Sequence, residues 1–195
     1  HLGDGWTGCP ETEPDITVLH QLTMTSGLDD GVLNPDCTLP DCLGCLDDPG
    51  ARWAYHNGVY TQLTEVLSEA TGMGLNVYLA TRLNQPIGAS LLYLNAGFNR
   101  VILSKPRDMA RFGLLALREG LWAGDTVLPP GYLAQAMSPS QDLNPSYGHL
   151  WWLNGQDSYL YPTLQFSFPG PLIPTAPADA YAALGKNDQK LYIVP

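Results

Sequence analysis

The stretch GARWAYHNGVY, residues 50–60, determines how the rest of the chain is interpreted. It combines a turn, two aromatic anchors and the triplet Tyr55-His56-Asn57, and it stands directly before the strongest helical pattern in the sequence. A tyrosine and an asparagine two residues apart in an irregular segment can direct a phenol and an amide into one cleft, where the phenol exchanges a proton and the amide holds a carbonyl. Alone, such a triplet is more often ordinary loop chemistry, so its meaning depends on the remaining motifs.

The composition indicates a folded globular protein. The chain has 195 residues, of which 45% are apolar and 14% charged, and it contains 20 glycines and 17 prolines. It is therefore long enough to bury a core and rich in ordered loops. The formal net charge is −10 and the nine basic residues are scattered, which argues against binding nucleic acid or an anionic membrane. No apolar run approaches the roughly 20 residues that span a bilayer.

Four cysteines, Cys9, Cys37, Cys42 and Cys45, lie near the start of the chain. Their spacing resembles half a zinc knuckle or a plant-type iron–sulfur run, but no second CxxC and no nearby histidine pair completes either site. Two disulfides that hold the Pro- and Asp-rich loop 28–50 are therefore favoured over free thiols or a metal. Disulfides indicate an oxidising compartment, so the protein is expected to be periplasmic or secreted. Four cysteines allow three pairings. We prefer Cys37–Cys42 with Cys9–Cys45, but the spacing of the cysteines does not exclude the other two pairings.

Periodicity and turn residues predict helices first and strands last. The predicted helices cover residues 17–24, 59–71, 75–83, 104–120 and 132–137. Thr17 and Ser104 are the expected N-caps, Leu19 and Leu22 are expected to face inward, and the third helix is expected to stop before Pro86. Strands are expected near residues 148–153 and in a terminal hairpin, residues 181–194, whose turn is at residues 186–188.

Residues 16–28 (ITVLHQLTMTSGL), residues 49–58 and residues 104–113 (SKPRDMARFG) together carry a resemblance to a known family. They are similar, in the same order, to the segments ITIRHLLTHTSGL, PG..F.YSN and S.PRDMARFG of the serine β-lactamase-related hydrolases. That family includes class C β-lactamases, DD-peptidases, esterases and 6-aminohexanoate-dimer hydrolases. Further similarities lie at residues 71–72 with 86–88, at residues 147–152 and at residues 183–195. The resemblance implies an α+β fold of the β-lactamase and penicillin-binding-protein type, incomplete at both ends. Residues 1–146 would form a mainly helical lobe, and residues 147–195 the first returning strands of an antiparallel sheet.

The resemblance also implies roles for particular residues. The family uses a Ser-x-x-Lys that supplies the nucleophile and a lysine, a Tyr-x-Asn pair, and a Lys-Thr-Gly-like strand beside the oxyanion hole. Tyr55 would then be the catalytic phenol that takes and returns the proton of the nucleophile. Asn57 would bind the acyl side of the substrate, with His56 in the variable position and Gly185 near the third element. The implied substrate is a small-molecule or peptide-like ester, amide or β-lactam, and no cofactor or metal is implied.

Two of these three elements depart from the family pattern. These 195 residues contain no Ser-x-x-Lys, and Ala183-Leu184-Gly185 lacks the cation and hydroxyl of the third element, with Lys186 one place late. The chain also begins at His1 rather than Met. We therefore expect a fragment or processed subunit that is inactive alone, with the nucleophile in a missing segment or a companion chain. The alternative is a non-catalytic binding or scaffold protein that keeps the lobe and has lost the chemistry.

Other polar residues favour structural interpretations. His20 is expected to cap or pack rather than to act as a base. The pairs Asp29-Asp30 and Asp47-Asp48 lack the ligand spacing of a calcium site and favour solvated turns. Arg107 and Arg111, four residues apart, are expected to form ion pairs with acidic side chains.

Overall fold

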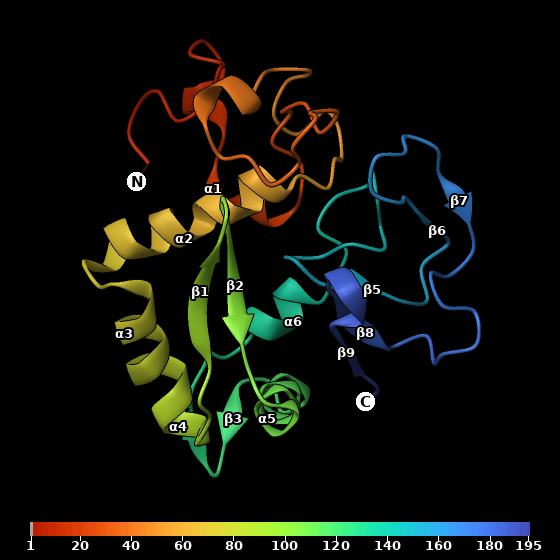
Figure 1. The fold of residues 1–195 in the computed structure, drawn as a ribbon. Helices are drawn as coiled ribbons and strands as arrows, with labels where there is room; N and C mark the ends of the chain where they lie inside the picture. The colour runs from red at the N-terminus through yellow and green to blue at the C-terminus, as the bar shows by residue number, and fades with distance from the viewer. Residues whose placement is uncertain (1) are drawn as a thin grey trace. The chain divides into compact units, whose positions relative to one another are not determined.

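The computed structural model describes residues 2–195 (Figure 1). The chain divides into two compact units. Unit 1 contains the chain up to Val77 together with residues 93–103 and 162–165, and unit 2 contains residues 78–92, 104–161 and 166–195. The predicted lobes, residues 1–146 and 147–195, stay a prediction. None of the helices in residues 2–195 has the length and apolar content needed to cross a bilayer.

Short elements separated by long loops make up both units. In chain order they are η1 (Glu13–Asp15), α1 (Val18–Leu22), η2 (Pro40–Cys42), α2 (Asn57–Thr71), α3 (Leu75–Leu79), the π-helical turn η3 (Ala80–Asn84), α4 (Gln85–Ile87), β1 (Leu92–Ala96), β2 (Asn99–Leu103), α5 (Pro106–Leu117), β3 (Leu121–Trp122), β4 (Asp125–Thr126), α6 (Tyr132–Ala136), β5 (Trp152–Leu153), β6 (Ser158–Tyr159), β7 (Phe168–Pro169), β8 (Tyr181–Leu184), η4 (Lys186–Asp188) and β9 (Lys190–Ile193).

Helix α1 begins after Thr17, as predicted. The Thr17 hydroxyl accepts a hydrogen bond from the backbone N–H of His20, and the imidazole of His20 accepts one from the backbone N–H of Thr17, both at 3.2 Å. His20 therefore completes a reciprocal cap, which confirms its structural interpretation. Leu19 is 50% exposed, so its predicted inward orientation is wrong. The buried position is Gln21, and two residues along a helix point to nearly opposite sides.

Both predicted disulfides are present in unit 1. Cys9 is bonded to Cys45 and Cys37 to Cys42, and no cysteine is free, so the metal-binding alternatives are wrong for this cysteine set. The Cys9–Cys45 bond joins the N-terminal loop to a core cluster in which Leu28, Leu43 and Val59 are also buried. The disulfide pair therefore fixes a loop whose regular structure is limited to the short turn η2.

Helix α2 confirms the strongest periodic pattern of the sequence. It ends at Gly72, which adopts φ 63° in the left-handed region favoured by glycine. Val59 and Val66, two apolar residues of this helix, are buried at 1% and 9% exposure. The hairpin β1–β2 of unit 1 was not predicted, although Gly97, at φ 64°, stands in the two-residue turn between its strands.

Several helix boundaries differ from the prediction, and two of the differences have a local cause. The third helix does not stop before Pro86, because a π-helical turn, in which the Gln85 N–H donates to the Ala80 carbonyl, widens the helix just before the proline. Helix α5 begins one residue later than predicted. Its N-cap is Lys105, without a side-chain hydrogen bond, so the expected cap by Ser104 is wrong. Within α5, Arg111 forms an ion pair with Asp108 at 2.8 Å, which confirms the ion pair predicted for Arg111.

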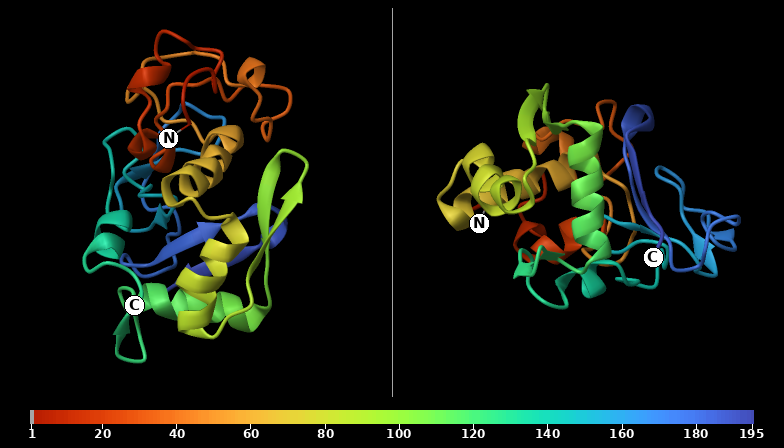
Figure 2. Two further views of the ribbon diagram at one scale, coloured as in Figure 1. Left: turned by 90° about the vertical axis from the view of Figure 1, so that its left-hand side faces the viewer. Right: turned by 90° about the horizontal axis from the view of Figure 1, so that it is seen from below.

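The core of unit 2 is built on α5, α6 and the terminal strands. Figure 2 shows α5 alongside β8 and β9, and the strands pair antiparallel in the order β5-β8-β9. Trp151 stacks on Phe112 of α5 with ring centres 6.2 Å apart, and it meets the Tyr181 ring edge-on at 5.5 Å. A Cβ at Gly113 would lie 3.0 Å from a methyl of Leu191, so glycine lets the helix approach the last strand. The predicted terminal strands are confirmed.

A buried carboxylate, Glu13, organises the N-terminal loop of unit 1. Its two oxygens accept hydrogen bonds from the Gly5 N–H at 2.6 Å and from the N–H and hydroxyl of Thr7 at 2.7 Å each. Burial raises the pKa of this carboxyl, but the hydrogen bonds from Thr7 and Gly5 outweigh burial and hold the pKa below its ordinary value of 4.5. The charged form is therefore the one that stabilises the fold.

Replacing Glu13 by Gln should lower the free energy of unfolding by about 1–3 kcal/mol at pH 7, because three donors lose a charged acceptor. Because the folded-state pKa is lowered, this contribution is present above pH 4.5 and disappears as the pH falls through the folded-state pKa. Urea unfolding at pH 7 and at low pH checks this, with the exposed Glu69→Gln as the matched control. A wild-type advantage that stays constant down to strongly acidic pH would contradict it.

Candidate functional site

Backbone hydrogen bonds join residues 24–29 to residues 44–54, the two motif-bearing segments of unit 1. The N–H of Ala54 donates to the carbonyl of Met24 at 2.8 Å, and the carbonyl of Gly27 accepts two N–H groups from the facing segment at 2.9 and 3.0 Å. Gly27 has φ 79°, and a Cβ there would lie 2.3 Å from a carbonyl oxygen of that segment. The Thr-Ser-Gly-Leu and Pro-Gly…Tyr-x-Asn segments thus form one unit of structure, which fixes where the chain enters α2.

Tyr55 lies just before α2 among aromatic rings. Its ring centre is 6.5 Å from that of Trp53 and 6.0 Å from that of Tyr60, which it meets edge-on. Trp53 is 1% exposed, and its carbonyl accepts a hydrogen bond of 3.0 Å from the amide of Gln165. Burial, with a smaller contribution from Tyr60, raises the pKa of Tyr55 to about 12. The phenol is therefore held in a partly buried aromatic environment and stays protonated at neutral pH.

Asn57 is the first residue of α2, and the cysteine loop fixes its side chain. Its amide nitrogen donates to a carboxylate oxygen of Asp36 at 2.7 Å, and the next residue, Gly58, donates its N–H to the carbonyl of Pro35 at 3.0 Å. A Cβ at Gly58 would lie 2.2 Å from the carbonyl oxygen of Cys37, so only glycine permits this approach. Because a carboxylate only accepts hydrogen bonds, Asp36 determines which way the Asn57 amide is turned.

Asp30, Arg52 and His56 form a buried polar cluster beside the Tyr55–Asn57 segment. Arg52 donates to Asp30 at 2.6 Å, and the two side chains are 14% and 6% exposed. The interpretation of Asp30 as part of a solvated turn is therefore wrong. His56 is 2% exposed, and neither ring nitrogen makes a hydrogen bond of normal geometry, although the backbone of Asp29 lies near the ring. One oxygen of Asp30 and one terminal nitrogen of Arg52 are also buried without a partner.

The cluster sets the charge state of His56. Burial is the largest effect and lowers the pKa of His56, and the neighbouring Arg52 acts in the same direction. The carboxylates of Asp30 and Asp29 and the backbone of Asp29 oppose this shift without overcoming it. The imidazole is therefore neutral at pH 7, and its predicted contact with substrate stays a prediction.

Gly185, the remaining predicted site residue, lies in unit 2 directly after β8. Its N–H donates to the carbonyl of Gln189 at 2.8 Å, and a Cβ there would lie 2.6 Å from the same oxygen. Gly185 thus closes the terminal hairpin. Its assignment to a substrate-binding element rests on the resemblance.

Sequence reasoning missed three residues that hold the Tyr55–Asn57 segment: Asp30, Asp36 and Arg52. Each pairs with a residue about 20 positions away, and no local periodicity connects such positions. The available signal was compositional, because Arg52 is one of only nine basic residues and stands within a loop rich in aspartate. Within residues 2–195 no group of three or more His, Cys, Asp or Glu side chains is placed to hold a metal ion.

A beta-lactamase family profile matches residues 10–185, so the chain belongs to the beta-lactamase family. The match includes residues 24–29 and 44–54 of unit 1 and extends through β8 of unit 2. The comparison with curated proteins gives no match.

Several solved structures have a similar fold. They include a Bacillus anthracis protein described as a "putative 6-aminohexanoate-dimer hydrolase" (20% identity, TM-score 0.65) and a penicillin-binding protein homologue of Caulobacter crescentus (13%, 0.57). A D-amino acid amidase of Ochrobactrum anthropi is also similar (19%, 0.51). The alignments cover 100%, 92% and 86% of this chain and 58%, 64% and 61% of those proteins. The chain therefore has part of the mixed α/β fold of β-lactamases and penicillin-binding proteins, spanning about 60% of these relatives.

Tyr55→Phe should remove the most alkaline component from the ultraviolet titration of the tyrosines, because burial raises the pKa of Tyr55 to about 12. The measurement is absorbance near 295 nm, the tyrosinate band, from neutral to strongly alkaline pH, recorded as a wild-type minus variant difference. Tyr132→Phe, at a position 42% exposed, is the matched control and should leave that component in place. A difference curve with its midpoint near pH 10 would contradict the buried environment.

His56→Gln should flatten the dependence of stability on mildly acidic pH. The folded-state pKa of His56 is lowered from 6.5, so the stability of the neutral form is present above pH 6.5 and is lost as the pH falls through the folded-state pKa. One proton gives a slope of at most about 1.4 kcal/mol per pH unit. Urea unfolding between pH 7.5 and pH 5 measures both slopes, and His20→Gln is the control. Parallel slopes for wild type and His56→Gln would refute the assignment.

Proposed function

We propose that this chain is part of a serine hydrolase that acts through an acyl-enzyme on an ester, amide or β-lactam. Tyr55 carries the proton of the nucleophile, and Asn57 binds the acyl side of the substrate. The observation that carries the proposal is the arrangement of the Tyr55–Asn57 segment. One residue is held by aromatic rings and the other by Asp36, immediately before a helix anchored by the cysteine loop. Fixed donors and proton carriers of this kind are what acyl transfer requires.

The raised pKa of Tyr55 specifies what the complete enzyme must add. A phenol with a pKa of about 12 is protonated at neutral pH and cannot accept a proton from a serine hydroxyl. A cation within about 4–6 Å would lower that pKa by favouring the phenolate. A Ser-x-x-Lys motif would supply both groups. Its lysine would be the cation, and its serine, three residues earlier, would be the nucleophile. Because these 195 residues contain no such motif, they should not form an acyl-enzyme alone.

The two disulfides also support a proposal for the cellular compartment of the protein. Two disulfides hold the loop against which Asn57 and Gly58 pack, and such bonds persist in oxidising environments. We therefore place the protein in the periplasm or outside the cell. Its partners would be a small-molecule or peptide-like substrate and the segment or chain that carries the nucleophile.

A non-catalytic binding or scaffold function is the second candidate. The observation that favours it is the pair of side-chain states at the site: the phenol of Tyr55 is protonated, and the amide of Asn57 already donates to Asp36. A protein of this kind would bind a ligand without turning it over, and its function would not depend on the hydroxyl of Tyr55.

The deciding experiment compares the 195-residue chain with the product of its native gene read in frame on both sides. Each is incubated with a 4-nitrophenyl ester and with a β-lactam acyl label, and covalent adducts are measured by intact mass. The chain alone should form no adduct. A longer product that contains Ser-x-x-Lys should be acylated, and Tyr55→Phe in that product should slow acylation by about 10²–10⁴-fold, the usual contribution of a general base.

Tyr132→Phe in the longer product is the matched control, because it removes a phenol at an exposed position and should leave the acylation rate unchanged. A covalent adduct on the 195-residue chain would overturn the expectation that it is inactive alone. Acylation of the longer product that survives Tyr55→Phe would overturn the role of Tyr55. A gene without an in-frame Ser-x-x-Lys would favour the binding or scaffold function.

A further inference from the structure

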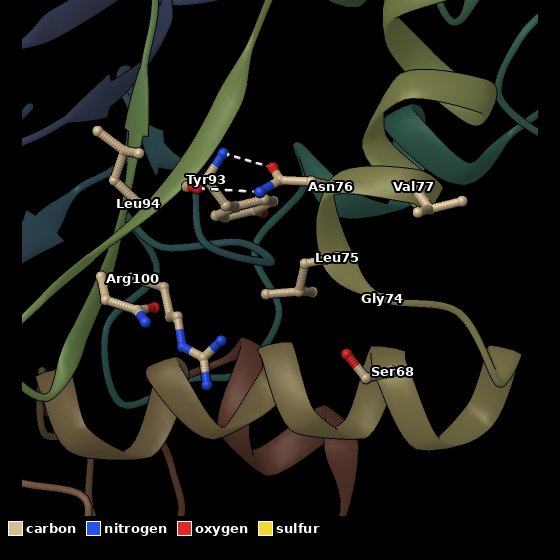
Figure 3. Close-up of a pocket in the computed structure, with 9 residues that line it drawn as sticks. Ser68, Gly74, Leu75, Asn76, Val77, Tyr93, Leu94 and Arg100 are labelled. Carbon is tan, nitrogen blue, oxygen red and sulfur yellow. Dashed lines mark hydrogen bonds between the residues drawn. The ribbon is translucent and has the colours of Figure 1, made fainter.

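A cavity of about 560 Å³ lies in unit 1 between α2, the start of α3 and the hairpin β1–β2 (Figure 3). None of its lining residues belongs to residues 50–60. Figure 3 shows the side chain of Leu75 and the guanidinium of Arg100 directed into this space, with the hydroxyl of Ser68 facing it from α2. The cavity thus combines an apolar floor, since Leu75 is 9% exposed, with a cationic group at its side.

The strand β1 presents an edge to this cavity, and Asn76 occupies one position of that edge. The N–H of Tyr93 donates to the side-chain oxygen of Asn76 at 2.7 Å, and the side-chain nitrogen of Asn76 donates to the carbonyl of Tyr93 at 3.1 Å. Asn76 therefore imitates a neighbouring strand for one residue. Backbone groups two residues apart on a strand face the same edge, so the N–H and carbonyl of Asn95, which also lines the cavity, face the same way.

Arg100 brings charge to the position next to Asn95. Its side chain is 33% exposed, and one of its terminal nitrogens is paired with Glu65. A guanidinium has five N–H donors in a planar fork, so one carboxylate does not exhaust its donors. A ligand with a secondary amide and a carboxylate would meet both features, because the amide can pair with a strand edge and the carboxylate with the remaining donors.

We infer that this cavity is a binding site for small acyl amino acids, compounds that carry a secondary amide, a carboxylate and an apolar side chain. The ligand amide hydrogen-bonds to the backbone of Asn95, two residues along the same strand edge from the Tyr93 backbone that Asn76 binds. The carboxylate is bound by Arg100, and the apolar side chain lies over Leu75. The chain has a net charge of −10, so the carboxylate is retained by this local cation and not by a general attraction for anions.

The test is a titration of the ¹⁵N-labelled chain with N-acetyl-leucine, followed by NMR. Saturable shifts are expected at residues 74–77 and 93–100. N-acetyl-leucinamide, which lacks the carboxylate, should bind about tenfold more weakly, as expected for loss of a charge-assisted hydrogen bond. Arg100→Gln should abolish this difference, whereas Arg82→Gln, at an exposed position in unit 2, should preserve it.

A second variant separates the strand edge from the charge. Asn95→Pro removes the N–H that faces the cavity and no hydrogen bond between β1 and β2, so the spectrum should stay dispersed while both ligands weaken. Glu65→Gln should tighten N-acetyl-leucine, because it removes the carboxylate that competes for Arg100. If no saturable shifts appear up to about 20 mM ligand, a concentration well above the dissociation constant of a millimolar site, the proposal is overturned. Equal binding of the two ligands to the wild-type chain would also overturn it.

Discussion

The architecture of unit 1 depends on the antiparallel contact between residues 24–29 and residues 44–54. Neither segment is a helix or a strand, so their backbone groups must find partners in each other. The contact allows no side chain at Gly27, and Leu28 is paired across it with Cys45. The Cys9–Cys45 disulfide joins this contact to the N-terminal loop. The consequence is a rigid entry into α2 from a region with almost no regular secondary structure.

The cysteine loop performs a second, more local task. Residues 35–38 lie on the first turns of α2, where the N–H of Gly58 and the side chains of Asn57 and Gln62 all donate to them. The first N–H groups of a helix have no partner within the helix, so the carbonyl of Pro35 satisfies one donor, the N–H of Gly58, that would otherwise need water or a cap. His56, the N-cap residue, provides no side-chain cap. The loop replaces the missing cap and at the same time fixes the amide of Asn57.

The sequence predicted those parts of the fold that local patterns determine. Helix α2 followed from its apolar spacing and Gly72, the terminal strands from their turn, and the disulfides from the incomplete metal motifs. The hairpin β1–β2 was missed because apolar residues stand on both faces of its strands, with Leu94, Val101 and Ile102 all more than 40% exposed, so there was no alternation to detect.

The polar cluster around Arg52 and Asp30 could not be predicted for a different reason. The two residues are 22 positions apart, and they are brought together by the tertiary contact between their segments. Adjacent aspartates in a loop are normally solvated, so the aspartate pattern alone favours the wrong interpretation. The desolvation cost of a buried ion pair can offset the attraction between its charges, so the pair is weak evidence for stability.

The two polar residues of the Tyr55–Asn57 segment are prepared to different degrees for the proposed reaction. The amide of Asn57 has two N–H donors and one is bound to Asp36, so the second donor has a defined direction and can meet a substrate carbonyl without reorganisation. Tyr55 is positioned by its ring contacts, but its protonation state is wrong for accepting a proton at neutral pH. Positioning is therefore a property of these 195 residues, whereas activation of the phenol requires a cation. A single lysine placed near the ring would change the charge state of the site without any change in its geometry.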